Sequence, residues 1–355
     1  MGLTGPVLVV GTGLLGTSIA LAARRAGLDV LLSDVSPEHL RTASGLGAGR
    51  PVADGDAPQL VVVATPPDHL GVAIAEALTR YDAVVTDVGS VKSAPLREVS
   101  ERVGAEALER YVGSHPMAGS ERSGPLAASA ALFEARPWAV TPHPSSDPGA
   151  VELVSALASA CGATVVTLPP EEHDRAVART SHLPHLLAVL VAGRLADAPA
   201  AHLSLSGQGV RDVTRVAGSD PALWQQIVAS NAPAVLELLS EVRAELDAMI
   251  TAVSGGSREG LGVLLDRGVA GTQAIPGKHG GPVRATAPVF VSLPDHPGEL
   301  ARLFADAGVI GVNIEDVRID HDPGRDTGLV ELVVAEDSAL HLAASLEDRG
   351  WVVHG

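Results

Sequence analysis

Val7-Leu8-Val9-Val10-Gly11-Thr12-Gly13-Leu14-Leu15-Gly16 is the stretch that decides the fold. Its first four residues are apolar and mostly β-branched, which predicts a buried strand, and the G-x-G-x-x-G spacing that follows predicts a turn into a helix over residues 17–26. In such a turn Gly11 makes the tight bend, Gly13 lets phosphates approach the backbone, and Gly16 lets the helix pack closely on the strand. A plain strand–turn–helix is the alternative. The stretch predicts a dinucleotide-binding site made of Gly11, Thr12, Gly13, Leu14, Leu15 and Gly16.

The rest of this α/β chain divides into segments with different patterns. Further apolar runs separated by helical stretches predict a Rossmann-type, doubly wound parallel sheet over residues 1–168; these runs are residues 30–33, 60–64, 83–86, 138–141 and 163–168. Helix patterns dominate an all-helical segment over residues 169–272. Residues 273–284 are rich in Gly and Pro and indicate a linker. Residues 285–355 show the order βαββαβ, which is typical of a ferredoxin-like domain.

Two positions bear on the choice of dinucleotide. Asp34 ends the second expected strand, where a carboxylate accepts hydrogen bonds from both ribose hydroxyls and repels a 2′-phosphate, so the sequence favours NAD over NADP. A strand-end or helix-capping role is the alternative for Asp34. Thr65 and Pro66 follow another strand at the edge of the sheet where ligands bind, and we expect them to form a wall beside the adenosine. A rigid turn explains them equally well.

Candidate catalytic residues follow the later strands. Ser90 lies after the strand over residues 83–86, close to where a nicotinamide would bind, and a helix N-cap is its alternative role. Lys92 is one of only two lysines, beside 23 arginines, so a generic solvated role explains it poorly. His115 precedes a proline and therefore lies in extended backbone, among glycines and hydroxyls, where an imidazole can take up a proton near neutral pH.

Two further segments carry candidate substrate-binding residues. Ser181-His182-Leu183-Pro184-His185 places two histidines three residues apart, on one face of a helix, which both substrate contact and helix packing explain. We expect no metal there, because further ligands are lacking. Arg211 and Arg215 lie on a segment flanked by glycines, where a guanidinium can hold a carboxylate through two hydrogen bonds. A solvated helix charge is the alternative for both arginines.

A long helix with an apolar seam is expected over residues 235–253. Apolar side chains recur at alternating spacings of four and three residues, at Val235, Leu239, Val242, Leu246, Met249 and Val253. The seam predicts packing either against another helix of the same chain or against a second subunit. Leu236, Leu238 and Ile250 widen the apolar face, which fits a deeply buried helix.

The composition excludes several classes of protein. The chain has 355 residues, 46% of them hydrophobic, and a formal net charge of −17, which argues against binding to nucleic acid or to an anionic membrane. About half of that charge lies in residues 285–355. The single cysteine, Cys161, excludes a disulfide framework and multi-cysteine metal sites. No apolar run is long enough to span a membrane and no basic leader precedes the first strand, so we expect a cytoplasmic protein.

Taken together, the motifs resemble those of the prephenate/arogenate dehydrogenase family of tyrosine biosynthesis, almost from end to end. The resemblance rests on the glycine loop, Asp87–Lys92, Ser114–Glu121, Ser181–His185, and Asp212–Arg215 with Trp224. Gln208 and Val210 depart from it, since the family more usually has Gly and Phe there. Residues Val291–Leu300 look like the opening of an ACT domain, an amino-acid-sensing module attached to many such enzymes.

The resemblance implies a role for each matched residue. His115 would deprotonate the 4-hydroxyl of the substrate ring, Ser90 would hydrogen-bond the same region, and Arg215 would hold the side-chain carboxylate. The pocket would be lined by Ser120, Glu121, Ser181, His182 and His185. The implied reaction is NAD-dependent oxidative decarboxylation of prephenate to 4-hydroxyphenylpyruvate, or of arogenate to tyrosine. The implied assembly is a homodimer, with an aromatic amino acid as effector.

Two other functions are alternatives to the dehydrogenase function that the resemblance implies. A β-hydroxyacid dehydrogenase or an imine reductase shares the two-domain plan, but the His115 segment and the ACT-like tail count against it. A non-catalytic sensor could bind a dinucleotide and an amino acid. Such a sensor would not need His115, Ser90 and Arg215 together.

Overall fold

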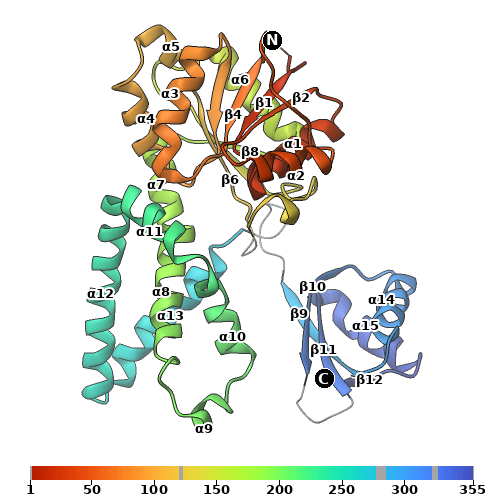
Figure 1. Cartoon of the computed structure of the whole chain (residues 1–355). Helices are drawn as coiled ribbons and strands as arrows, with labels where there is room; N and C mark the ends of the chain where they lie inside the picture. The colour runs from red at the N-terminus through yellow and green to blue at the C-terminus, as the bar shows by residue number, and fades with distance from the viewer. Residues whose placement is uncertain (1, 120–122, 277–284, 322–326, 355) are drawn as a thin grey trace. The chain divides into compact units, whose positions relative to one another are not determined.

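The computed structural model describes residues 2–119, 123–276, 285–321 and 327–354 (Figure 1). The chain forms two compact units, residues 1–244 and 245–355. The first unit opens with five parallel strands in the order β3-β2-β1-β4-β5. Their bounds are β1 Val7–Val10, β2 Val30–Ser33, β3 Arg50–Pro51, β4 Leu60–Val63 and β5 Val84–Asp87.

Helices cover both faces of this sheet, because successive side chains of a strand point to opposite faces. Val7 and Val9 of β1 pack with α1 and α6, whereas Leu8 packs in a second cluster with α3 and α4. The doubly wound architecture expected from the sequence is therefore confirmed. The helices are α1 Leu14–Arg25, α2 Pro37–Gly45, α3 Leu70–Arg80, α4 Ser93–Ser100, α5 Ala105–Glu109 and α6 Pro148–Ala160, with short turns η1 Pro67–His69 and η2 Pro125–Ala127.

A second, three-stranded sheet differs from the all-parallel expectation. It consists of β6 (Gly113–Pro116), β7 (Pro137–Thr141) and β8 (Thr164–Thr167), and β6 runs antiparallel to β7. His115, expected in a pocket loop, lies on β6 opposite Ala139. The sequence of β6 has no apolar alternation that would predict a strand. Its conformation depends instead on tertiary contacts, such as the hydrogen bond from the Thr141 hydroxyl to the Gly113 carbonyl.

The helical part of the first unit starts directly after β8. Its elements are α7 Pro170–Val177, a π-helical turn η3 Ala178–His182, α8 Leu183–Gly193, α9 Ala200–Leu203, α10 Gln208–Thr214, a short turn η4 Arg215–Gly218, α11 Pro221–Ser230 and α12 Ala232–Ser254. Its core is small, with Ala178, Val235 and Leu238 as the buried centre. None of the helices in the described residues is both long enough and apolar enough to cross a bilayer. The cytoplasmic location stays a prediction.

Within the single chain, the deep burial expected over residues 235–253 is found only at the start of α12. The buried side chains Val235 and Leu238 lie at the start of α12, where the small core is. Beyond that core the apolar face is uncovered in the single chain. The exposed fractions are 54% for Leu246, 37% for Met249, 55% for Ile250 and 63% for Val253, and Leu236 nearer the start is 61% exposed. Packing within one chain therefore does not account for the seam.

The second unit contains the end of α12, then α13 (Arg258–Gln273) and the C-terminal domain. This domain follows the expected βαββαβ order, with its strands arranged β10-β11-β9-β12 in one antiparallel sheet. Its core draws only on residues of the domain itself, among them Val291, Leu332 and Leu346. The elements are β9 Thr286–Pro294, α14 Glu299–Ile310, β10 Ile314–His321, β11 Thr327–Ala335, α15 Glu336–Glu347 and β12 Val352–His354.

Candidate active site

The glycine loop after β1 is sterically fixed at two positions and open at the third. Gly11 has a φ of +95°, and a Cβ there would lie 2.6 Å from the Ala64 carbonyl oxygen. A Cβ on Gly16 would lie 1.9 Å from the Gly11 carbonyl oxygen, whereas a Cβ on Gly13 would meet no protein atom within 4 Å. Because no protein contact requires a glycine at position 13, a ligand that approaches the backbone at the N-terminus of α1 accounts for it.

Asp34 stands beside this loop, held by hydrogen bonds on both carboxylate oxygens. Its Oδ2 accepts from the backbone N–H and, at 2.7 Å, from the hydroxyl of Thr12. Its Oδ1 accepts from the Ser36 N–H at 2.7 Å. The capping interaction of α2 is made by the Ser36 side chain, so the helix-capping alternative for Asp34 is wrong. These hydrogen bonds also fit the strand-end alternative, and the contact of Asp34 with ribose hydroxyls stays a prediction.

Thr65 adds a polar group at the carboxyl edge of β4. Its hydroxyl is buried and has no hydrogen-bond partner among the described residues. Thr65 directly follows Ala64, whose carbonyl faces Gly11, and Pro66 leads from it into η1. Buried hydroxyls are seldom left without a partner. This one fits a group that contacts a nucleotide bound along the glycine loop.

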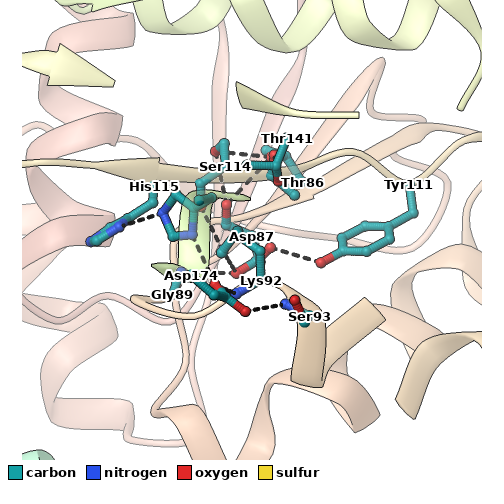
Figure 2. A network of polar contacts seen from close by, with 12 residues as sticks. Thr86, Asp87, Gly89, Lys92, Ser93, Tyr111, Ser114, His115, Thr141 and Asp174 are labelled. Atoms are coloured by element: carbon teal, nitrogen blue, oxygen red, sulfur yellow. Dashed lines mark hydrogen bonds and ion pairs between the residues drawn. The ribbon is translucent and has the colours of Figure 1, made fainter. Parts of the chain in front are cut away.

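A buried ion pair between Asp87 and Lys92 lies at the carboxyl edge of β5 (Figure 2). Lys92 is 1% exposed, and its Nζ donates to the Asp87 carboxylate and, at 2.7 Å, to the Ser114 carbonyl. Asp87 also accepts from the Tyr111 hydroxyl at 2.9 Å and from the Gly89 N–H at 2.8 Å. Burial lowers the pKa of Lys92, while the charge of Asp87 acts in the opposite direction. The network joins β5, the loop after it and β6.

His115 extends from β6 and makes a hydrogen bond through one ring nitrogen. Its Nδ1 lies 3.0 Å from Nε2 of His173, a residue of α7. Burial lowers the pKa of His115 well below the ordinary value of an imidazole, and the charges of His173, Lys92 and His182 act in the same direction. The imidazole is therefore neutral at pH 7, which is the form that can accept a proton.

Ser90 lies in the loop between β5 and α4 and does not cap the helix. α4 begins at Ser93, and the backbone N–H groups of Lys92 and Ser93 each donate to the Asp174 carboxylate at 2.8 Å. The helix-cap alternative for Ser90 is therefore wrong. Ser90 lines a cavity of about 20 Å³ together with Pro67, Ile227 and Ser230, and its hydroxyl makes no hydrogen bond with a described residue.

His182 and His185 lie where the π-helical turn passes into α8, and both contact Trp224 of α11. The ring of His185 stacks on the indole with centroids 3.5 Å apart, and His182 meets the indole edge-on at 6.0 Å. Burial lowers the pKa of His182 to about 4 and also lowers the pKa of His185. The predicted placement of both rings on one helical face is confirmed. No cluster of His, Cys, Asp or Glu in the described part of the chain is arranged to hold a metal ion.

The remaining candidates differ in their surroundings. Arg215 begins η4, which packs against α8, and both it and Arg211 of α10 are exposed, with no hydrogen bond or ion pair to a described residue. Ser181 is half-buried in the π-helical turn. Ser120 and Glu121 lie outside the described residues, so their expected roles stay predictions.

Three buried polar residues at the site were missed by the sequence analysis. His173 and Asp174 lie near the start of α7, and Asn231 precedes α12. The Nδ2 of Asn231 donates to the Asp174 carbonyl at 2.8 Å and lies 3.2 Å from Nδ1 of His182. The sequence does indicate that these two residues lie on a buried helix face, because His173 and Asp174 stand four residues before the apolar Val177 and Ala178. Polar residues on the buried face of a helix require partners.

Comparisons with known proteins match the same organisation. A family model described as the nucleotide-binding domain of prephenate dehydrogenase matches residues 19–167, and one described as the dimerization domain of prephenate dehydrogenase matches residues 169–267. The curated protein named probable prephenate dehydrogenase NovF, from Streptomyces niveus, is 38% identical over 97% of this chain and 98% of its own length. The chain belongs to the prephenate dehydrogenase family.

Solved structures of prephenate and arogenate dehydrogenases share this architecture. The prephenate dehydrogenase of A. aeolicus, solved in complex with hydroxyphenyl propionate and NAD+, aligns with a TM-score of 0.69 at 27% identity, over 77% of this chain and 98% of that one. The arogenate dehydrogenase of Synechocystis aligns with a TM-score of 0.65 at 26% identity, over 75% of this chain and 98% of that one. The family and the fold class expected from the sequence are therefore confirmed, while the roles of the individual site residues stay predictions.

The glycine loop of this prephenate dehydrogenase family member allows a matched test. G16A places a methyl group against the Gly11 carbonyl, so we expect it to lower the free energy of unfolding by about 2 kcal/mol or more. G13A meets no protein atom and should leave stability unchanged, yet weaken dinucleotide binding by about tenfold or more because the methyl group occupies the phosphate approach. Thermal unfolding and calorimetric titration measure the two effects. Wild-type dinucleotide affinity in G13A would contradict the assignment of the loop.

Proposed function

We propose that the chain catalyses the NAD-dependent oxidative decarboxylation of prephenate to 4-hydroxyphenylpyruvate. The observation that carries the proposal is His115, a neutral imidazole held by a hydrogen bond next to the carboxyl edge of the nucleotide-binding sheet. Ser90, whose hydroxyl makes no hydrogen bond with a described residue, lies in the loop that follows β5 of that sheet. Membership of the prephenate dehydrogenase family supports the choice of substrate.

The residues around the glycine loop fit NAD. The open approach at Gly13 accommodates the pyrophosphate, Asp34 accepts the ribose hydroxyls, and the unpartnered hydroxyl of Thr65 is available to the nucleotide. Leu14, Leu15 and Gly16 form the first turn of α1, whose N-terminus favours negative charge. The chemistry that NAD supplies when bound is hydride acceptance at the nicotinamide ring.

The protein contributes proton transfer and positioning. His115 accepts the proton of the 4-hydroxyl as a hydride leaves the same ring carbon, so that a ketone forms there. The ketone is conjugated through the ring to the carbon that bears the carboxylate. As the bond to the carboxylate breaks and carbon dioxide leaves, the electron pair of that bond enters the ring, which becomes aromatic, and the ketone oxygen becomes a phenolate. The proton held by His115 then returns to the phenolate oxygen, which balances the reaction. Ser90 hydrogen-bonds the same oxygen and orients it toward His115.

Charge recognition of the substrate is assigned to the helical part. Arg215 has no partner among the described residues and lies on a segment packed against α8, so its guanidinium is available to the side-chain carboxylate. His182 and His185 form an uncharged wall against Trp224, His185 stacked on the indole and His182 edge-on to it. Ser181, Ser120 and Glu121 complete the proposed pocket, the last two as sequence-based predictions.

Arogenate is the second candidate substrate. It carries an amino group where prephenate has a keto group, and its oxidation gives tyrosine directly. The similarity to the Synechocystis arogenate dehydrogenase supports this candidate. Both substrates require the same proton transfer at the ring hydroxyl, so they differ only in recognition of the side chain.

The proposal is tested by mixing the purified protein with NAD and either substrate and following NADH absorbance. We expect turnover, and we expect H115N to lower kcat by about 100-fold or more because the base is lost. H341N changes an exposed histidine of α15 and serves as the matched control. Absence of NADH from both substrates would refute the dehydrogenase function, and wild-type turnover in H115N would refute the role of the base.

We further propose that the chain is a homodimer joined through α12. The support is the uncovered apolar face formed by Leu246, Met249, Ile250 and Val253, which continues the seam of the helix. The described residues of α13 expose further apolar side chains, including Val263 and Val269. Exposed apolar patches of this kind mark association surfaces. The matching family model is described as a dimerization domain.

A pair of charge substitutions on α12 tests the dimer. L246D introduces a carboxylate into the seam and should shift the protein from dimer to monomer at micromolar concentrations in analytical ultracentrifugation, because burying an unpaired charge costs several kcal/mol. A244D adds the same charge to the same helix, at an exposed position outside the seam, and should remain dimeric. If L246D stayed as dimeric as A244D, this face would not be the interface.

Residues 285–355 are assigned to a regulatory domain that binds an aromatic amino acid. The domain has its own core and the ferredoxin-like strand order. The alignment with the Streptomyces niveus relative covers 97% of this chain, so it includes most of this domain. A module with an independent core suits a sensing role, and most of the linker expected over residues 273–284 lies outside the described residues.

Truncation before residue 285 tests the regulatory role. Turnover should persist because all candidate site residues precede this point. Inhibition by tyrosine or phenylalanine should weaken by about fivefold or more, which corresponds to the loss of a coupling of about 1–3 kcal/mol. Inhibition curves for the full chain and the truncated chain provide the measurement. Superimposable curves would rule out a sensor role.

A further inference from the structure

Two buried side chains, Asp174 and His173, form a hydrogen-bonded line that ends at the half-buried His115. Asp174 and His173 are consecutive residues of α7, and His173 Nδ1 lies 2.9 Å from Asp174 Oδ1. The other nitrogen of that ring, Nε2, lies 3.0 Å from Nδ1 of His115 on β6. The rings of His115 and His173 meet edge to face, with centroids 5.2 Å apart. Figure 2 labels the two ends of this line, His115 and Asp174.

The hydrogen-bond partners determine which nitrogen of each ring carries the proton. An ionised carboxylate only accepts, so His173 donates to Asp174 from Nδ1–H, and in the neutral form of this ring Nε2 carries the lone pair. That lone pair requires a donor on the other side, and this donor is Nδ1–H of His115. The remaining nitrogen of His115, Nε2, therefore carries the lone pair that a general base needs.

Asp174 is well placed to fix the far end of the line. Burial opposes the ionisation of its carboxyl group, but hydrogen bonds from His173, from Ser93 and from the Lys92 N–H outweigh this effect and lower the pKa of Asp174. The two backbone donors belong to the start of α4, so the carboxylate cannot rotate without leaving those N–H groups unpaired. The line therefore begins at a fixed negative charge and ends at the proposed base.

We propose that His173 is a positioning residue that holds His115 in the tautomer with Nδ1 protonated and Nε2 ready to accept the substrate proton. This inference rests on the proposed function of His115 as the base. When Nε2 takes up the proton, His115 becomes an imidazolium whose Nδ1–H still donates to His173. The proton stays on His115, because His173 keeps its own Nδ1 proton on the side of Asp174.

Two substitutions of His173 separate the two halves of the line. The amide of asparagine reaches the position of the histidine Nδ1, so H173N keeps a donor toward Asp174 but loses the acceptor for His115. The amide of glutamine reaches the position of Nε2, so H173Q keeps an acceptor for His115 and loses the link to Asp174. Asp174 itself is a poorer target, because its carboxylate also caps α4.

The kinetic test compares these variants in the full-length enzyme. We expect H173N to lower kcat by about 100-fold, with an unchanged KM for NAD, because the base is misoriented or in the wrong tautomer. H173Q should retain kcat within about tenfold of the wild type, since the acceptor for Nδ1–H is restored. Equal kcat values for the two variants, or a kcat for H173N close to that of the wild type, would overturn the proposal.

A spectroscopic test does not depend on the substrate. Protein labelled with ¹⁵N-histidine reports the protonated nitrogen of each ring by long-range ¹H–¹⁵N correlation, and H115N identifies the His115 signals by their absence. The wild type should show His115 protonated at Nδ1, and H173N should lose this preference. A wild-type ring protonated at Nε2 would overturn the positioning role even in an active enzyme. The expected tautomer in a protein that oxidises neither substrate would instead leave this inference standing and refute the proposed function.

Discussion

The carboxylate of Asp174 is the interaction on which the rest of the site depends. It accepts hydrogen bonds from two N–H groups at the start of α4 and from the ring of His173, and its own backbone carbonyl accepts from Asn231. One residue of α7 therefore connects the nucleotide-binding sheet, the proposed base and the helical part of the first unit. Burying a carboxylate costs desolvation free energy unless the group is fully hydrogen-bonded, and here several donors together offset that cost. The same donors fix its orientation.

The surroundings of Lys92 explain why this position holds a lysine in a chain whose other basic residues are almost all arginines. Its compact ammonium group donates both to Asp87 and to the carbonyl of Ser114, within a space that excludes water. A planar guanidinium would not fit this arrangement in the same way. A buried ion pair adds little net stability, so its main effect is geometric. It holds Ser114, and with it the adjacent His115, against the end of β5. Both of these partners of Lys92 Nζ belong to the protein itself.

The sequence specified the parts of the molecule that depend on local pattern. The β1 strand and the glycine loop were predictable because strand hydrophobicity and the clash at Gly16 are properties of neighbouring residues. The strand around His115 was not, since β6 owes its conformation to β7 and to Lys92 rather than to its own residues. The contact between His115 and His173 spans 58 residues of sequence and leaves no periodic pattern. The apolar character of the α12 seam was predicted correctly, but the burial of its side chains depends on the helix or subunit that packs against it.

The charge distribution of the site follows from the chemistry that it has to perform. A base must be neutral before it acts, and burial keeps His115, His182 and His185 uncharged by lowering their pKa values. A dianionic substrate, however, needs positive charge, and the chain has a formal net charge of −17. A cation that binds the substrate carboxylate at a distance from the imidazoles leaves the proton affinity of the base little changed, whereas the nearby charge of Lys92 already lowers the pKa of His115. In the proposed site, Arg215 is exposed on η4 while His182 and His185 are buried, so the proposed carboxylate contact lies nearer the solvent than these imidazoles.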